Sequence, residues 1–443
     1  MSNSSASRHG LFTRLLTCTL AAALFAPATF AGAPSGKTES EPAIAKPAAS
    51  KPAAPKTDES NEALVQARIQ VVGSIENIQN IPGSAHYIGK EELEKQEYSD
   101  IHRILRTVPG INIQEEDGLG LRPNIGMRGT GVERSQKITL MEDGVLIAPA
   151  PYTAPAAYYF PTAVRMESVE VLKGPSAITQ GPNTNGGALN MISSSIPNDF
   201  SARLDASGGS HGTQKFRAVV GDSKDRYGWI IDGLNLSSDG FKDLDNGGDT
   251  GTEVKDYMGK FRFNSAPTAA IYQSVELKLG KTEQYGNETY LGLTDADFAA
   301  TPLRRYTGSA EDFIDTDHEQ FQLRYFVKPT QNMDITTTLY NNNFARNWHK
   351  MERVGGISNG SILANPTDYD QHLALIRGQL DSADADGVNN AGAMTIRNNN
   401  REYYSRGIQS VLNFAIGNDR AQHTIDFGIR YHEDEEDRLQ HDE

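Results

Sequence analysis

The chain has 443 residues, of which 37% are hydrophobic and 22% are charged, and its formal net charge is −15. The acidic balance argues against a nucleic-acid partner, because binding to phosphates requires a basic surface that releases counterions. After residue 33 no run of about 18 apolar residues could cross a bilayer as a helix, which excludes an ordinary helical membrane protein. At about 150 residues per domain the length would suit three compact domains, but that estimate assumes a uniform composition, which this chain lacks.

Residues 1–33 have the pattern of a cleaved secretory signal. A basic stretch that includes Arg14 precedes a short apolar core at residues 15–25, and small residues follow up to Ala33. The only cysteine, Cys18, lies inside this segment, so the mature chain would contain no disulfide and no thiolate metal site. The segment predicts an exported protein.

Residues 34–62 are rich in Ala, Pro, Lys, Ser and Glu and contain almost nothing large and apolar. Such a stretch cannot bury enough surface to fold, and its prolines favour an extended tether. Residues 63–74 follow and include a β-prone stretch, Val65–Gly73, which is a candidate edge strand between the tether and the first folded part.

Residues 75–198 predict a compact domain of mixed α and β structure. A helix is expected at residues 90–107, because Leu93, Ile101 and Leu105 fall on one side of it and a Pro-Gly pair follows. Short strands, several of them separated by glycine turns, are expected at residues 84–88, 111–114, 125–128, 138–141, 166–172 and 188–192.

Residues 199–443 change to longer strands. About nine segments have apolar residues at alternate positions, which is the period of a sheet with two different faces. In one of them Tyr257, Phe261 and Phe263 face one way, while Lys260 and Arg262 face the other.

The connections between these strands distinguish a membrane barrel from a soluble sandwich, since the strands of both alternate. Short turns and long polar loops follow one another along the chain, which is typical of an outer-membrane barrel with tight turns on one rim. The charged faces would then line water or a plug, and the apolar faces would meet lipid. A soluble β-sandwich is the alternative. The short turns are expected at residues 221–226, 328–333 and 417–420, and the long loops at residues 238–256, 283–317 and 350–401.

Five blocks between residues 123 and 197 resemble, in order and spacing, the plug domain of TonB-dependent outer-membrane receptors. Within that family, residues 140–152, with the Asp143–Gly144 turn, are similar to the ferric citrate (Fe(3+) dicitrate) receptor branch. The blocks are residues 124–129, 138–145, 166–175, 181–182 and 186–190.

The resemblance implies a mainly β fold, in which an N-terminal α+β plug domain at residues 75–198 precedes an antiparallel transmembrane β-barrel. The family barrel has about 22 strands. Only about the first nine would be present at residues 199–443, so we expect an incomplete barrel.

The resemblance also implies roles for individual residues. A TonB-type energy-coupling protein would capture a TonB box by strand addition. Arg128 and Lys173 match basic plug positions that pair with barrel carboxylates, and they would form a latch. For both residues a solvated surface charge is the alternative, and Lys173 lacks the forked geometry of the commoner arginine. The TonB box would consist of Arg68, Ile69, Gln70, Val71, Val72 and Gly73.

The implied cargo is an anionic ferric chelate, iron(III) citrate or a related siderophore. Arginine is the expected contact, because its forked donors match carboxylate oxygens. Each candidate could instead be a solvated loop residue. The candidate ligand residues are Arg122, Arg134, Tyr152, Arg304, Arg305, Arg346 and His349.

These features predict a receptor in the outer membrane whose partners are the coupling protein, the ferric chelate and membrane lipid. Chelated iron needs neither a cofactor nor metal ligands from the protein, and no Ser-His-Asp or HExxH arrangement points to an enzyme. Two alternatives stay open. The cargo could be haem, cobalamin or zinc, or the barrel could display its loops for adhesion without transport.

Overall fold

The computed structural model describes residues 70–154, 158–287, 289–380, 394–418 and 421–443, all of which belong to one compact unit. The predicted signal at residues 1–33 and the predicted tether at residues 34–62 lie outside the described residues. The first part of the predicted TonB box, including Arg68 and Ile69, also lies outside them.

The first folded part of the chain is built on a five-stranded sheet in the order β1-β6-β7-β4-β5. Its strands are antiparallel except for the parallel pair β4 and β7. A separate two-stranded sheet joins β2 and β3. Every strand predicted for this part is present, with its ends within one residue of the prediction, and β5 is additional. The strands are β1 Ser84–Ile88, β2 Ile111–Gln114, β3 Asn124–Met127, β4 Ile138–Glu142, β5 Val145–Leu146, β6 Met166–Lys173 and β7 Gly187–Ser193.

The single helix predicted at residues 90–107 is wrong in its middle, where the structure has two short helices, α2 Lys90–Gln96 and α3 Ile101–Leu105. Glu97 ends α2 in the left-handed conformation, with φ of 48°. Asp100 begins α3 by accepting the backbone N–H of His102 at 2.8 Å. Short 3-10 helices complete this part: η1 Glu76–Asn80, η2 Glu133–Ser135, η3 Ala163–Arg165 and η4 Pro175–Thr179.

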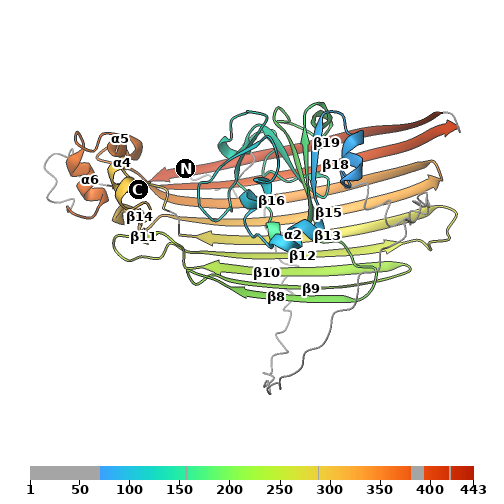
Figure 1. The fold of residues 1–443 in the computed structure, drawn as a ribbon, viewed down its shortest axis with the longest axis horizontal. Coiled ribbons are helices and arrows are strands. Elements are labelled where there is room, and N and C mark those ends of the chain that lie inside the picture. Colours follow the sequence, from blue (N-terminus) through green and yellow to red (C-terminus); the bar gives the residue numbers. More distant parts are fainter. Residues whose placement is uncertain (1–69, 155–157, 288, 381–393, 419–420) are drawn as a thin grey trace, which may run out of the picture. The chain divides into compact units, whose positions relative to one another are not determined.

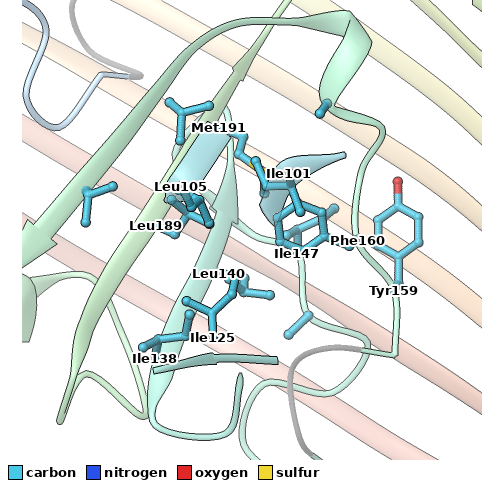
Figure 2. Packing of buried hydrophobic residues seen from close by; sticks show 14 of the residues in the cluster. Ile101, Leu105, Ile125, Ile138, Leu140, Ile147, Tyr159, Phe160, Leu189 and Met191 are labelled. Atoms are coloured by element: carbon cyan, nitrogen blue, oxygen red, sulfur yellow. The ribbon is translucent and has the colours of Figure 1, made fainter. Parts of the chain in front are cut away.

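The hydrophobic core of this part lies between α3 and the five-stranded sheet. Ile101 and Leu105 of α3 pack with Leu140 of β4 and with Leu189 and Met191 of β7, and each of these side chains is at most 1% exposed. Figure 2 shows these side chains gathered together. Apolar burial thus holds the helix on the sheet and fixes the loops that leave it.

The second part is one sheet of long antiparallel strands that pair in chain order from β8 to β19, with β17 joined to β16 (Figure 1). The nine strands of this path confirm the number predicted. They are β8 Ser201–Gly208, β9 Gln214–Lys224, β10 Tyr227–Ser238, β12 Thr252–Asn264, β13 Tyr272–Gly286, β15 Phe313–Thr330, β16 Met333–Val354, β18 Met394–Asn418 and β19 Ala421–Asp442.

The predicted difference between the two faces of this sheet is confirmed. On β12 the side chains of Tyr257 and Phe263 are 51% and 66% exposed, whereas those of Lys260 and Arg262 are 2% and 8% exposed. Apolar side chains therefore cover the outer face, and charged side chains lie on the face that meets the first folded part.

The predicted alternation of short and long connections is also confirmed. Two residues separate β9 from β10 and two separate β15 from β16, whereas long connections follow β10, β13 and β16. The predicted bounds of the long loops are too wide, because the strands extend into them: β12 begins at Thr252 and β18 begins at Met394. The long connections carry α4 Asp295–Ala300, α5 Asn359–Ala364, α6 Asp370–Ile376, η5 Thr307–Ser309, β17 Ile357–Ser358 and the paired strands β11 Asp243–Leu244 and β14 Arg304–Arg305. In the described part of the chain, every helix is too short or too polar to span a bilayer.

Candidate functional site

Three of the predicted ligand arginines converge on one tryptophan of the long sheet. Trp348 lies on β16 and is 4% exposed. The guanidinium carbons of Arg122, Arg134 and Arg346 lie 6.0, 5.2 and 5.8 Å from the centre of its ring. Arg122 and Arg134 come from the first folded part and Arg346 from β16, so the two parts of the fold meet here.

A second aromatic ring completes this group. Tyr158 lies in the loop before η3, and the guanidinium carbon of Arg346 stands 4.2 Å from its ring centre. Arg134 and Arg401 each lie 5.8 Å from the same ring. An arginine placed over an aromatic ring is attracted by the negative face of the ring. We call these six residues the arginine cluster: Arg122, Arg134, Tyr158, Arg346, Trp348 and Arg401.

Strand geometry explains why β16 contributes so much charge at one place. Arg346, Trp348 and Lys350 are alternate residues, and alternate side chains of a strand point to the same face. The sheet register then places Arg401 of β18 directly opposite Arg346. Like charges directly opposite one another destabilise a strand pair, so the fold brings positive charge together here at an energetic cost.

Carboxylates neutralise three of the four arginines in the arginine cluster. The bond to Arg134 is bidentate, which is the strongest geometry for such a pair. The pairs are Arg134 with Glu116 at 2.5 and 2.7 Å, Arg401 with Glu436 at 2.7 Å, and Arg122 with Asp117 at 3.9 Å.

Arg346 is the exception. It is 3% exposed, and within the described residues it makes no ion pair with a carboxylate. Its Nε lies 3.4 Å from the hydroxyl of Tyr403, and its buried Nη1 has no hydrogen-bond partner there. A buried, unpaired charge is costly. The arginine cluster therefore suits an anion that could accept hydrogen bonds from this guanidinium.

Two of the predicted ligand residues lie away from the arginine cluster. Tyr152 is 60% exposed, and its backbone N–H donates to Asp434 of β19 at 2.7 Å. His349 stacks on Phe313 with ring centres 4.8 Å apart, and its Nδ1 lies 2.9 Å from a backbone carbonyl. A role of either residue in ligand binding stays a prediction.

Arg304 and Arg305 are also held elsewhere. Arg304 pairs with Asp245 at 2.8 Å and with Asp297 at 3.2 Å, within the long connections. Arg305 donates to two nearby backbone carbonyls at 3.0 and 2.6 Å. Both therefore have partners that fix the loops, and a ligand role for them stays a prediction.

The two parts of the fold are also joined by a buried ionic contact at the Glu142–Gly144 turn. Lys278 of β13 donates to Glu142 at 2.5 Å and to Asp143 at 2.6 Å. Lys260 of β12 lies 3.3 Å from the same oxygen of Asp143. All four residues are at most 2% exposed. Water does not reach these charges, so each is stabilised by its ionic partners.

Arg165 extends this contact. It donates to Glu142 and, at 2.9 Å, to Asp256 of β12. Burial alone would raise the pKa of the Glu142 carboxyl, but Arg165 and Lys278 beside it lower that pKa to about 2. For Asp143, burial would likewise raise the pKa, and Lys260 and Lys278 hold it well below its usual range. Both carboxylates are therefore ionised while the turn is in place.

The predicted latch residues are not part of this contact. Arg128 is exposed and follows β3 in the left-handed conformation, with φ of 58°. Lys173 donates to the backbone carbonyl of Pro109 at 2.6 Å. Among the described residues neither forms an ion pair with a carboxylate of the long strands, so the latch stays a prediction.

The described end of the predicted TonB box, Gln70–Gly73, does not form the strand expected from the sequence. The backbone N–H groups of Val71, Val72 and Gly73 donate to the side chain of Glu170 on β6 at 2.7, 3.1 and 2.7 Å. The expected strand is wrong for these residues, because a single carboxylate draws three successive N–H groups to one side.

The sequence reasoning missed the aromatic half of the site. Trp348 could have been found, since it alternates with Arg346 just before the long loop predicted at residues 350–401. Lys350 was placed in that loop, whereas the structure has it on β16. Arg401 and Tyr158 carried no such signal, because they join the site only through the register of β18 and the path of the loop before η3.

Comparison with protein families identifies the first folded part of the chain. Residues 77–188 match the family model described as the TonB-dependent Receptor Plug Domain. The matched range begins in η1 and ends in β7 and therefore includes the five-stranded sheet, α3, Arg134 and Tyr158.

Two curated relatives match part of the chain. The chain is 27% identical over 195 residues to the vitamin B12 transporter BtuB of Photobacterium profundum, a match that covers 41% of this chain and 31% of that protein. It is 29% identical over 159 residues to the iron-regulated outer membrane virulence protein of Vibrio cholerae, covering 34% of this chain and 22% of that protein.

Solved structures extend the likeness to the long strands. The ferric citrate transporter FecA in its unliganded form has a TM-score of 0.65 at 18% identity and covers 84% of this chain. The ferric-catecholate import receptor Fiu of E. coli, in its open form, has a TM-score of 0.56 at 16% identity and covers 80%. The chain spans 50% and 49% of those two structures, and at these identities the likeness concerns the fold. The family match identifies residues 77–188 as a TonB-dependent receptor plug domain, and the long two-faced strands share the fold of the receptor structures compared.

Proposed function

We propose that this chain serves in an outer-membrane receptor that imports an anionic ferric chelate, most simply iron(III) citrate or a related carboxylate siderophore. The observation that carries the proposal is the buried guanidinium of Arg346, which has no carboxylate partner among the described residues and stands opposite Arg401. A multivalent carboxylate chelate would supply the missing negative charge and the acceptor oxygens for forked hydrogen bonds.

The position of the arginine cluster supports a ligand role. It joins a plug loop to the end of β16 that leads into a long connection, and family barrels place their long loops outside the cell. A ligand that reached this place would touch both the plug and the barrel wall. Binding could therefore change the contact between the two, which an import cycle requires.

The names of the proteins compared favour a ferric chelate as the cargo. Of the proteins compared, two are described as receptors for ferric chelates and one as a vitamin B12 transporter. Because cobalamin lacks the several carboxylates of a citrate complex, it would leave the charge of Arg346 largely unmatched. Catecholate chelates share the negative charge and would fit the aromatic rings of Tyr158 and Trp348.

Location and energy coupling complete the proposal. The exposed apolar side chains of the long strands, such as Phe263 and Ile429, each 66% exposed, suit contact with lipid. Together with the predicted signal at residues 1–33, they support an outer-membrane location. Residues 68–73 would be the TonB box through which a TonB-type protein pulls on the plug.

Ligand binding tests the cargo. Iron(III) citrate should quench the fluorescence of Trp348 in the purified receptor, with Trp229→Phe in the background so that Trp348 is the only tryptophan. Arg346→Gln should weaken binding about tenfold or more, since it removes a charge-assisted contact. Arg304→Gln is the matched control, because Arg304 is satisfied by Asp245 and Asp297. Equal loss in both variants would refute the site.

A chelate panel and an uptake assay test the function. Ferric citrate, a ferric catecholate, haem and cobalamin should be compared in growth rescue of an iron- or cobalamin-limited host, and rescue by cobalamin alone would overturn the iron proposal. Deletion of residues 68–73 should abolish uptake of radioactive iron citrate while leaving binding intact. Uptake that survives the deletion would overturn energised transport.

A further inference from the structure

Arg134 of the arginine cluster is bound by a carboxylate of the protein in the geometry that a ligand carboxylate would adopt. Its Nη1 and Nη2 donate to the two oxygens of Glu116 at 2.5 and 2.7 Å. Two parallel hydrogen bonds of this kind are the usual way in which arginine recognises a carboxylate. The side chains of Arg134 and Glu116 are 15% and 23% exposed, so the pair is not sealed inside the protein. Glu116 therefore uses the two donors that a citrate carboxylate would need.

The backbone at Arg134 is strained. Arg134 and Ser135 have φ of 49° and 51°, in the left-handed region that residues other than glycine rarely adopt. Asn124 holds this turn, because its side chain accepts the backbone N–H of Arg134 at 2.7 Å and donates to Glu116 at 2.9 Å. Strain of this kind persists only where the surrounding structure enforces it, and it is concentrated at functional sites. The fold thus holds Arg134 beside Trp348 at an energetic cost.

The loop that carries Glu116 is folded by the next residue, Asp117. The carboxylate of Asp117 accepts the backbone N–H groups of Gly120 and Arg122 at 2.7 and 3.0 Å, and Asp117 is 4% exposed. Several backbone groups of residues 117–122 therefore depend on Asp117 for their hydrogen bonds. A change of partner at Glu116 leaves these bonds in place, so it does not unfold the loop.

An anionic chelate reaches the two donors of Arg134 only by exchange with Glu116. An incoming carboxylate replaces two charge-assisted hydrogen bonds with two of the same kind, and the partly exposed Glu116 passes to water, which solvates it. Such an exchange costs little free energy. A neutral cargo lacks the charge for this exchange. If it displaced Glu116, it would leave Arg134 unneutralised in a cluster that contains three other arginines.

The arginine cluster needs more than one anionic group from the cargo. One group replaces Glu116 at Arg134. A second is needed by the buried guanidinium of Arg346, which has no carboxylate partner in the part of the chain that the structure describes. The guanidinium carbons of Arg134 and Arg346 lie 5.2 and 5.8 Å from the ring centre of Trp348, so one small chelate can span both. A single carboxylate satisfies only one of them.

We propose that Glu116 is a specificity-determining residue that takes the place of a cargo carboxylate at Arg134. A chelate binds fully only when it carries at least two anionic groups, one of which displaces Glu116 while another pairs with Arg346. Glu116 thereby selects polyanionic ferric chelates over neutral cargo and over single carboxylates. The inference rests on the proposed function, because it takes the arginine cluster as the cargo site.

The test compares the wild-type receptor with Glu116→Gln in the full-length purified protein. Fluorescence of Trp348, with Trp229→Phe in the background, reports binding next to Arg134. Iron(III) citrate should bind Glu116→Gln about three- to tenfold more tightly, because a neutral amide competes less for the guanidinium. The affinity should also fall more steeply with salt, since the chelate then meets one more unneutralised arginine. Cyanocobalamin, which has no net charge, should gain nothing.

Control variants separate exchange at Arg134 from a general effect of charge. Glu115→Gln removes the same charge one residue away, from a pair with Arg106 outside the arginine cluster, and should leave the affinity unchanged. In an Arg134→Gln background, Glu116→Gln should give no gain, because the two residues act through one contact. If Glu116→Gln fails to fold, Glu116→Asp carries the test. Its carboxylate is drawn back by one methylene, so binding should tighten by about two- to threefold.

The outcomes distinguish this inference from the proposed function. Unchanged or weaker binding of iron(III) citrate to the folded Glu116 variants would overturn the inference alone, provided that the wild type binds. A gain that persists in the Arg134→Gln background would overturn the exchange, since Glu116 would then act only through its long-range charge. Absence of binding of every chelate to the wild-type receptor would overturn the proposed function and this inference together.

Discussion

Arg346 of β16 and Arg401 of β18 lie directly opposite each other in the sheet register, on the face that meets the plug. Glu436 pairs with Arg401 at 2.7 Å, and no carboxylate pairs with Arg346 in the described part of the chain. The sheet therefore keeps two like charges side by side. We expect such a pair to oppose folding and to favour anion binding.

Removal of the charge on Arg346 should separate these two effects. Arg346→Gln is expected to raise the free energy of unfolding by up to about 1 kcal/mol, because it relieves a directly opposed like-charge pair. The same change should weaken the binding of iron(III) citrate about tenfold or more. Chemical unfolding in detergent and fluorescence titration measure the two quantities. A variant that loses both stability and affinity would indicate a structural role for Arg346.

Tyr158 and Tyr152 offer a direct comparison within one loop. The ring centre of Tyr158 stands 4.2 Å from the guanidinium carbon of Arg346, whereas Tyr152 is 60% exposed and its ring is tilted against that of His432. Tyr158→Leu should weaken chelate binding by roughly three- to thirtyfold, which corresponds to a desolvated cation–π contact. Tyr152→Leu should weaken binding less. The reverse order in a titration series would favour the prediction from sequence, which chose Tyr152.

Lys278 should be essential for holding the plug in place. It is 2% exposed and bonds both Glu142 and Asp143, so Lys278→Met leaves two buried carboxylates short of a partner. Loss of one partner from a buried ion pair costs about 3–5 kcal/mol. Hydrogen exchange at residues 142–146 should accelerate accordingly. Lys281→Met is the control, because Lys281 is on the same strand and 34% exposed in its pair with Asp317, and its removal should have little effect.

Acid should loosen the same contact. The pKa of Glu142 is about 2 when the plug contacts the long sheet, whereas its ordinary value is 4.5. Ionisation of Glu142 therefore stabilises this contact fully at pH values above 4.5. As the pH falls from 4.5 toward 2, Glu142 takes up a proton in the separated plug before it does so in the contact. The separated plug is favoured by that proton uptake, so the stabilisation of the contact is lost. The lowered pKa of Asp143 acts in the same direction. Protease protection of the plug should therefore decline over this range, and Lys278→Met should flatten the decline.

The fold was largely predictable because its signals are local. Alternation of apolar and charged residues depends on neighbours two positions apart, and it located most of β12 from Tyr257 onward without tertiary knowledge. It missed the first residues of the strand, which begins at Thr252 inside the predicted loop. The helix at residues 90–107 failed for an equally local reason. Its apolar spacing runs through Glu97 and Asp100, but Asp100 caps a new helix more favourably than it continues the old one.

The site was only partly predictable because it depends on distant residues. Arg134 and Arg346 were chosen individually for their charge, yet they share Trp348 only because the plug loop and β16 meet. Sequence alone does not fix the register that sets Arg401 against Arg346. The backbone conformation of residues 71–73, which is not the expected strand, could not be predicted either. Its cause is the carboxylate of Glu170 on β6, about a hundred residues away in the sequence.

The buried ionic contact between the Glu142–Gly144 turn and the long sheet affects how the plug would separate from that sheet. Apolar contacts lose most of their stabilisation as soon as water reaches them, but the side chains of Glu142, Asp143, Lys278 and Arg165 exchange one set of polar partners for another. Interactions between charges weaken several-fold as the local dielectric constant rises toward that of water. While water is excluded, the ionic contact resists separation of the plug from the long sheet. Once a pull on the chain lets water reach these side chains, the same contact opposes further movement of the plug much less.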